Sequence, residues 1–214
     1  GPSHTGLEGF DLYGKTIGII GAGSIGCHVA QISKGFGMSA LVYDIHPQTD
    51  TDLSYVDLNE LLNKSDVISL HVPDTSRTRH MLSEKEFSKM KDGVVIINTA
   101  RGTVIDVKAL FSALKSGKVS AAGLDVLPEE PVIREEAELL RSSFSAKHDL
   151  ETVLTDYALL RQKNVIVTPH SAFYTREAVA KILRVTAQNI SSFTTGKPQN
   201  IVNIPQANTR KVAQ

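Results

Sequence analysis

The stretch KTIGIIGAGSIG, residues 15–26, decides the fold. Residues Thr16–Ile20 are mostly apolar or β-branched, which predicts a short strand buried on both faces of a parallel sheet. Gly21, Gly23 and Gly26 follow with the spacing G-x-G-x-x-G, which suits a tight turn, close approach of a pyrophosphate and close packing of the next helix. Apolar residues then recur at helical steps of 3–4 positions, at Ile25, Val29, Ile32 and Phe36. A helix that begins near Ser24 would direct free N–H groups at that pyrophosphate. The stretch therefore predicts a strand, a turn and a helix that bind a dinucleotide.

A carboxylate follows at the position that such a site requires. The second predicted strand, Ser39–Tyr43, ends at Asp44, close to the offset of about 20 residues expected for a ribose-binding acid. An acid there accepts hydrogen bonds from both ribose hydroxyls and repels a 2′-phosphate, and residues 45–47 contain no arginine or lysine to hold one. The pattern favours NAD over NADP. The alternative is an ordinary aspartate in a surface loop.

The remaining chain alternates predicted strands with predicted helices. The strands fall at 67–72, 94–99, 120–126 and 164–168, and the helices at 56–66, 83–90, 106–118 and 175–196. This order predicts an α/β protein with a doubly wound parallel sheet of the Rossmann type. The segment 131–163 is longer than a short crossover requires. Its helical spacing predicts either a helix that covers the sheet or a subunit contact.

Composition narrows the class of protein. The 214 residues are 41% hydrophobic and carry no net charge, which is typical of a globular domain without a nucleic-acid or membrane partner. The single cysteine, Cys27, excludes an internal disulfide and is compatible with a cytoplasmic location. The histidines lack metal-ligand spacing, so we expect no metal site. We expect residues 1–4 to be a cloning remnant, 5–203 a nucleotide-binding domain that includes the final helix, and 204–214 a tail.

Three reactive side chains follow consecutive strands. Arg101 comes after the fourth predicted strand, Asp125 ends the fifth with Glu129 and Glu130 just beyond it, and His170 follows the sixth. Because ligands bind outside the carboxyl ends of parallel strands, these side chains should meet at one edge. Arginine binds a carboxylate bidentately, histidine exchanges a proton near neutral pH, and a neighbouring acid orients the histidine. Beside a nicotinamide, these groups suit reduction of a 2-oxo acid.

At these residues the chain resembles the D-2-hydroxyacid dehydrogenase family, from about Gly9 to Asn203. The matching pieces are GKTIGIIGAGSIG, LHVPDT, INTARGTVID, GLDVLPEEP and TPHSAFYT. The resemblance implies that Arg101, Glu130 and His170 are the catalytic residues, with Glu129 as the rival of Glu130. It also implies a set of positions that contact NAD: Gly21, Gly23, Ser24, Ile25, Gly26, Asp44, Val72, Pro73, Thr78, Thr99, Ala100, Arg101 and Asp125. One departure is Asp74, where the family usually has an apolar residue.

The family also has a second domain, so the resemblance implies an NAD-binding domain from which most of the substrate domain is absent. We expect this fragment to be inactive or weakly active alone, and its parent to be a homodimer that acts on a small 2-oxo or 2-hydroxy acid. The segment HSAFYT resembles the D-lactate dehydrogenase branch. The alternatives are a phosphoglycerate or glyoxylate reductase of the same family and a non-catalytic NAD-sensing protein that resembles a corepressor.

Overall fold

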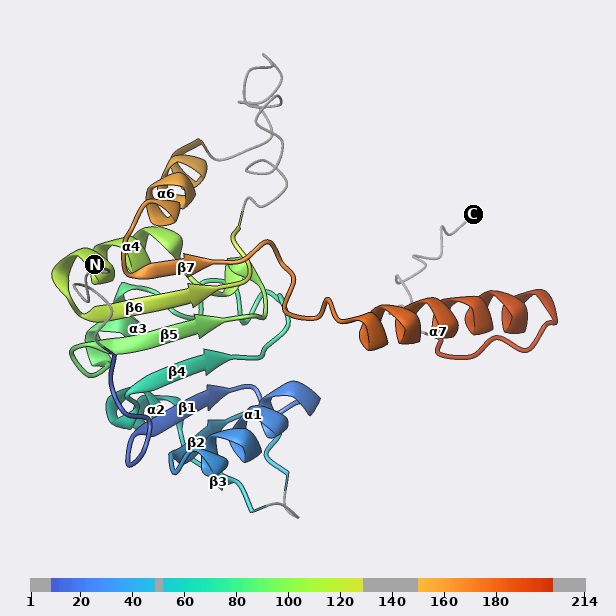
Figure 1. Ribbon diagram of the computed structural model, residues 1–214, viewed down its shortest axis with the longest axis horizontal. Coiled ribbons are helices and arrows are strands. Elements are labelled where there is room, and N and C mark those ends of the chain that lie inside the picture. The colour runs from blue at the N-terminus through green and yellow to red at the C-terminus, as the bar shows by residue number, and fades with distance from the viewer. Residues whose placement is uncertain (1–8, 49–51, 129–149, 202–214) are drawn as a thin grey trace, which may run out of the picture. The chain divides into compact units, whose positions relative to one another are not determined.

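A computed structural model describes residues 9–48, 52–128 and 150–201. The chain divides into two compact units, Gly1–Ala172 and Phe173–Gln214. The first unit is built on a seven-stranded sheet in which every pair of neighbouring strands is parallel, so that all carboxyl ends lie at one edge (Figure 1). The predicted doubly wound parallel sheet is confirmed.

The strand order is β3-β2-β1-β4-β5-β6-β7. The chain adds β2 and β3 on one side of β1 and then adds β4 to β7 on its other side. The strands are β1 (Thr16–Ile20), β2 (Ser39–Tyr43), β3 (Ser54–Tyr55), β4 (Val67–Leu70), β5 (Val94–Asn98), β6 (Val119–Leu124) and β7 (Val165–Val167). The sequence did not predict β3. Only two of its residues pair with β2, and so short a strand shows no alternation of apolar side chains.

One face of the sheet carries the larger core. Helices cover it: α2 (Leu58–Lys64), α3 (Glu84–Lys89), α4 (Val107–Ser116) and α6 (Leu150–Leu160). Fully buried side chains from strands and helices meet there, among them Ile68, Ile96 and Leu159. Because Leu159 lies in this core, α6 covers the sheet, as the first of the two sequence interpretations expected. The subunit contact remains a prediction.

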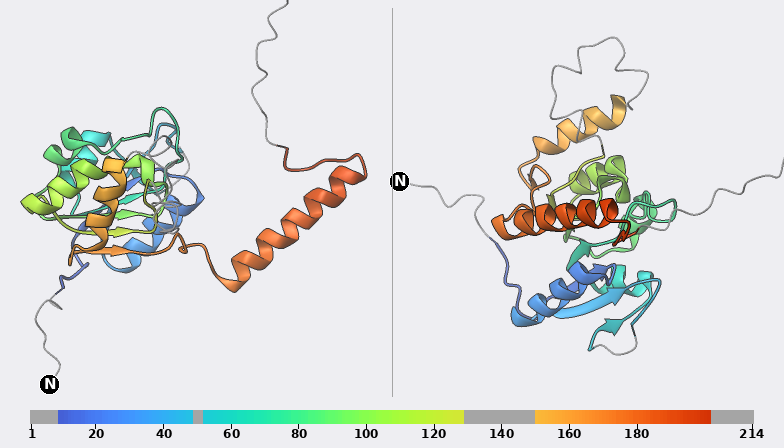
Figure 2. Two further views of the ribbon diagram at one scale, coloured as in Figure 1. Left: turned by 90° about the horizontal axis from the view of Figure 1, so that it is seen from above. Right: turned by 90° about the vertical axis from the view of Figure 1, so that its right-hand side faces the viewer.

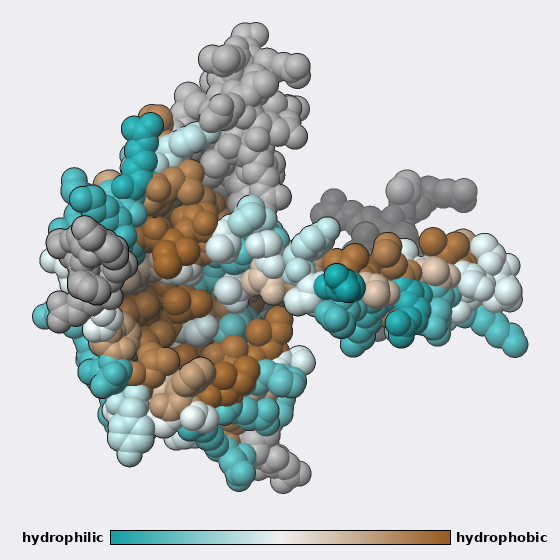
Figure 3. Space-filling view, viewed as in Figure 1, coloured by the Kyte–Doolittle hydropathy of each residue, from teal (hydrophilic) through white to brown (hydrophobic). Residues whose placement is uncertain are grey.

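The opposite face carries α1 (Ser24–Gly35), as the view from above shows (Figure 2). Its buried residues are the small ones, Gly26, Ala30 and Ser33, which let the helix lie close to β1. The apolar stripe that gives the helix its periodicity points outward instead. Ile25 and Ile32 are 66% and 60% exposed. Figure 3 shows apolar residues on the surface over α1.

The second unit contains α7 (Arg176–Thr194), which begins where Thr175 accepts a hydrogen bond from the Ala178 amide at 3.1 Å. None of its residues is buried. Its exposed apolar side chains include Ile182, Ile190 and Phe193. Among the described residues, no helix has both the length and the apolar composition needed to cross a membrane.

Candidate functional site

The glycine turn after β1 is shaped by two close approaches. Gly21 has φ +102°, and a Cβ placed on it would lie 2.6 Å from the carbonyl oxygen of His71. A Cβ on Gly26 would overlap the carbonyl oxygen of Gly21. The turn can therefore lie against both β4 and the first turn of α1 only because these two positions are glycine.

The start of α1 is exposed to solvent. Gly23 is the N-cap, and a Cβ placed on it would meet nothing within 4 Å. No side chain caps the helix and its first turn holds no acid, while Ser24 and Ile25 are exposed there. The free N–H groups and the positive helix end thus suit the negative pyrophosphate of a dinucleotide.

Asp44 stands beside this turn at the end of β2. Its Oδ2 accepts a hydrogen bond from the Ala22 amide at 2.7 Å, and its Oδ1 accepts one from the His46 amide at 2.8 Å. Each carboxylate oxygen has a further lone pair, so both can still accept a hydrogen bond from a ligand hydroxyl. The carboxylate therefore both braces the turn and offers acceptors where the ribose was predicted.

A pocket of about 690 Å³ opens between these elements, and we call it the glycine-turn pocket. Its lining includes Gly21, Gly23, Asp44, Val72, Pro73 and Thr78 from the predicted contacts. The Thr78 hydroxyl donates to the Pro73 carbonyl at 2.5 Å and closes the loop that forms one wall. The pocket is also lined by residues that the sequence interpretation did not name as cofactor contacts: Tyr43, Ile45, His46, Thr75, Ser76, Arg77 and Met81.

His71 also lines this pocket. Its Nε2 lies 2.9 Å from the Ser69 hydroxyl. Burial lowers the pKa of His71, which favours a neutral ring beside the turn. A neutral ring adds no positive charge to this wall.

Arg101 is positioned by a buried amide that the sequence interpretation missed. Asn98, at the end of β5, accepts from the Ala100 amide and donates to the Arg101 carbonyl, both at 3.0 Å. The guanidinium donates to the Ala100 carbonyl at 2.6 Å. Thr99 is exposed and Ala100 is buried in this turn. The sequence signal for Asn98 was its place at the strand end within INTARG.

The loop after β7 is held by Asp125, which is only 4% exposed. Its Oδ1 accepts hydrogen bonds from the Thr168 hydroxyl at 2.5 Å and the Ser171 amide at 2.8 Å, and its Oδ2 accepts from the Ala172 amide at 2.9 Å. Within this loop His170 has φ +53°, a conformation that a non-glycine residue seldom adopts. The carboxylate of Asp125 thus holds the loop through the Thr168 side chain before His170 and through two backbone amides after it.

The pKa of Asp125 reflects this environment. Burial pushes the pKa upward, but the hydrogen bonds from Thr168, Ala172 and Ser171, together with the charge of His170, outweigh burial and hold it below the ordinary value. The group is therefore an anion that the loop itself stabilises.

Arg101 and His170 line one pocket of about 160 Å³, which we call the Arg–His pocket. The other lining residues are Asp74, Gly102, Thr103, Val126, Leu127 and Pro128. The structure therefore brings together two of the three predicted catalytic residues from different strands. The third, Glu130, lies outside the described residues, as does its rival Glu129.

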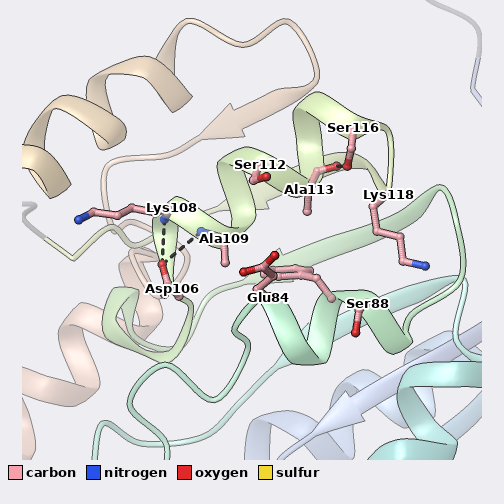
Figure 4. A pocket seen from close by; sticks show the side chains of 10 residues that line it. Glu84, Ser88, Asp106, Lys108, Ala109, Ser112, Ala113, Ser116 and Lys118 are labelled. Atoms are coloured by element: carbon pink, nitrogen blue, oxygen red, sulfur yellow. Dashed lines mark hydrogen bonds between the residues drawn. The ribbon is translucent and has the colours of Figure 1, made fainter.

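Another pocket, of about 410 Å³, lies between α3 and α4 (Figure 4). It is lined by charged and hydroxyl side chains such as Glu84, Lys108 and Ser112, and by none of the predicted site residues. Within the described part of the chain, no three His, Cys, Asp or Glu side chains gather closely enough to hold a metal ion.

Comparison with known proteins identifies the family. Residues 2–172 match the model of the D-isomer specific 2-hydroxyacid dehydrogenase NAD binding domain. The chain belongs to this dehydrogenase family. The NAD that this family domain binds fits the features described above: the open helix end, the glycine-turn pocket and Asp44.

Individual members of this dehydrogenase family are clearly similar. The chain is 41% identical to D-lactate dehydrogenase of Escherichia coli, over 90% of this chain and 57% of that protein. It is 39% identical to glyoxylate reductase of Korarchaeum cryptofilum, over 92% and 54%. The structure of D-lactate dehydrogenase from Aquifex aeolicus complexed with NAD and lactic acid superposes with a TM-score of 0.82 at 38% identity, covering 92% of this chain and 58% of that one.

The chain thus spans just over half the length of these dehydrogenases. The matched part is the NAD-binding domain, in agreement with the expectation that most of the substrate domain lies outside this chain.

Proposed function

We propose that the full-length protein reduces a small 2-oxo acid to the D-2-hydroxy acid with NADH, and that its substrate resembles pyruvate. The observation that carries the proposal is the Arg–His pocket, in which Arg101 and His170 line one small space at the carboxyl edge of the sheet. Similarity to D-lactate dehydrogenases supports the choice of substrate.

The two side chains divide the work by their chemistry. A guanidinium has five N–H donors, so Arg101 can bind the substrate carboxylate while it keeps its hydrogen bond to the Ala100 carbonyl. NADH, when bound, would supply a hydride for C2 of the substrate. His170 then donates a proton to the carbonyl oxygen, which becomes the hydroxyl of the product.

The surrounding residues hold these groups in place. Asp125 holds the loop before and after His170, which would let the imidazole approach the substrate from a set direction. Glu130 would pair with His170 and favour its protonated form, a role taken from the family resemblance. Asp44 would hold the ribose, and the helix start at Gly23 the pyrophosphate.

The test is a panel of 2-oxo acids with NADH on the full-length protein: pyruvate, glyoxylate, hydroxypyruvate and phosphohydroxypyruvate. We expect pyruvate to have the highest kcat/KM, and His170→Ala to lower kcat about 10²- to 10⁴-fold while NADH still binds, because a general acid contributes that much. A clear preference for glyoxylate or phosphohydroxypyruvate would favour the alternative reductases. Binding of NADH without reduction of any acid would favour the NAD-sensing protein.

A further inference from the structure

The Arg–His pocket contains a negative charge that the proposed reaction does not use. Asp74 lines this pocket together with Arg101 and His170, and it stands in the loop after β4. Reduction of a 2-oxo acid needs a cation for the substrate carboxylate and a proton donor for the oxygen. The proposed reaction assigns the acid beside His170 to Glu130 and gives Asp74 no role, so we sought the effect of Asp74 in the choice of substrate.

The charge of Asp74 is only partly compensated. Its Oδ2 lies 3.5 Å from Nη2 of Arg79, whose side chain is 61% exposed. An exposed ion pair at this distance is weak and is screened by water. No described residue donates a hydrogen bond to the other carboxylate oxygen of Asp74, and the Asp74 side chain is about one-third exposed.

We infer that Asp74 determines substrate specificity by excluding 2-oxo acids that carry a second negative group. The inference rests on the proposed function. Among the described residues that line the pocket, Asp74 is the only acidic one. Its negative charge remains on the pocket wall after the substrate carboxylate has paired with Arg101. Any acidic group on the rest of the substrate then meets a like charge within a pocket of about 160 Å³.

The size of the pocket makes the repulsion measurable. Two like charges several ångströms apart near a protein surface change affinity by about tenfold or more. A neutral or cationic side chain on the substrate avoids this cost. The pocket therefore suits small 2-oxo acids with an uncharged or positive side chain, and it disfavours dicarboxylic and phosphorylated ones.

The test compares two 2-oxo acids of equal length on the full-length protein with NADH. 2-Oxopentanoate has an uncharged end, and 2-oxoglutarate ends in a carboxylate. We expect Asp74→Asn, which keeps the shape of the side chain and removes its charge, to lower the preference for 2-oxopentanoate over 2-oxoglutarate in kcat/KM by about tenfold. We expect Arg79→Gln to raise this preference, since it removes the compensating charge.

The control is Glu60→Gln, which removes a carboxylate from the exposed ion pair with Lys64 at 2.7 Å on α2 and should leave the preference unchanged. An unchanged preference in Asp74→Asn, with 2-oxopentanoate still reduced by the unmodified protein, would overturn the inference alone. Failure to reduce any 2-oxo acid would overturn the proposed function and the inference with it. An equal change for both acids, with a shifted ratio of NADH to NAD affinity, would place the carboxylate at the cofactor instead and overturn the inference.

Discussion

The glycine-turn pocket and the Arg–His pocket lie at the same edge of one sheet but are built differently. The first, of about 690 Å³, owes its shape to backbone contacts at Gly21 and Gly26 that tolerate no side chain. The second, of about 160 Å³, presents charged side chains from three loops. Two buried polar residues, Asn98 and Asp125, hold two of those loops. Steric exclusion of side chains therefore shapes the glycine-turn pocket, whereas hydrogen bonds position the charged residues of the Arg–His pocket.

The largest effect on NAD binding should come from adding a side chain at Gly26, where the helix packs against the turn. We expect Gly26→Val to weaken NAD binding to this chain more than about a hundredfold, because its Cβ overlaps the Gly21 carbonyl oxygen and the helix must move away from the turn. Isothermal titration calorimetry with NAD would measure the loss. The matched control is Gly35→Ala at the end of α1, where an added Cβ meets nothing within 4 Å. Wild-type affinity in Gly26→Val would show that the dinucleotide does not need this close packing.

A smaller but distinct effect is expected at the hydrogen-bonded half. We expect Asp125→Asn to lower the free energy of unfolding by about 2 kcal/mol, since an amide cannot accept from the Thr168 hydroxyl and from both loop amides as the carboxylate does. Thermal unfolding at neutral pH would measure this. Asp92→Asn, which removes an exposed carboxylate paired with Lys118 at 2.8 Å, is the control and should change stability little.

The stability that the Asp125 carboxylate contributes should depend on pH. The pKa of Asp125 is held below its ordinary value in the folded chain. Its contribution to stability is therefore complete above the unfolded value of about 3.9 and is lost as pH falls through the folded pKa. Unfolding followed from pH 6 to pH 3 should show that the stability difference between wild type and Asp125→Asn shrinks in acid. A constant difference would mean that the charge of Asp125 does not stabilise the loop.

More of the glycine-turn pocket than of the Arg–His pocket could be predicted from the sequence. The glycine spacing, the strands β1 and β2 and the position of Asp44 could be read directly, because steric and charge requirements fall on neighbouring residues. Arg101 and His170 were found by their places after strands. Asn98 and the loop-holding hydrogen bonds of Asp125 were not, since their partners are set by how strands and loops meet in space.

The periodicity of α1 shows a second limit. Apolar residues at helical spacing predicted the helix correctly, but the side that packs on β1 is the one with Gly26, Ala30 and Ser33. Close approach to the glycine turn selects small residues, and the larger apolar ones remain outside. Spacing alone therefore predicts that a helix forms and leaves open which side it buries.

The smallest effect is expected at Asp44, which lines the glycine-turn pocket and also accepts hydrogen bonds from backbone amides. We expect Asp44→Ala to weaken NAD binding about tenfold and to reduce the preference for NAD over NADP, because the carboxylate that would accept from the ribose and repel a 2′-phosphate is gone. Calorimetric titration of both dinucleotides against this chain gives the two affinities.

Asp44 also braces the turn through the amides of Ala22 and His46, so weaker binding alone does not establish a ribose contact. The ratio of the two affinities separates the roles, because a loosened turn weakens NAD and NADP alike, whereas a lost ribose contact changes their ratio. Asp44→Asn sharpens the distinction: its amide oxygen can keep one of the two backbone hydrogen bonds while the negative charge disappears. If both affinities fell but their ratio stayed the same in both variants, Asp44 would only stabilise the turn. Its carboxylate would then not cause the preference for NAD over NADP.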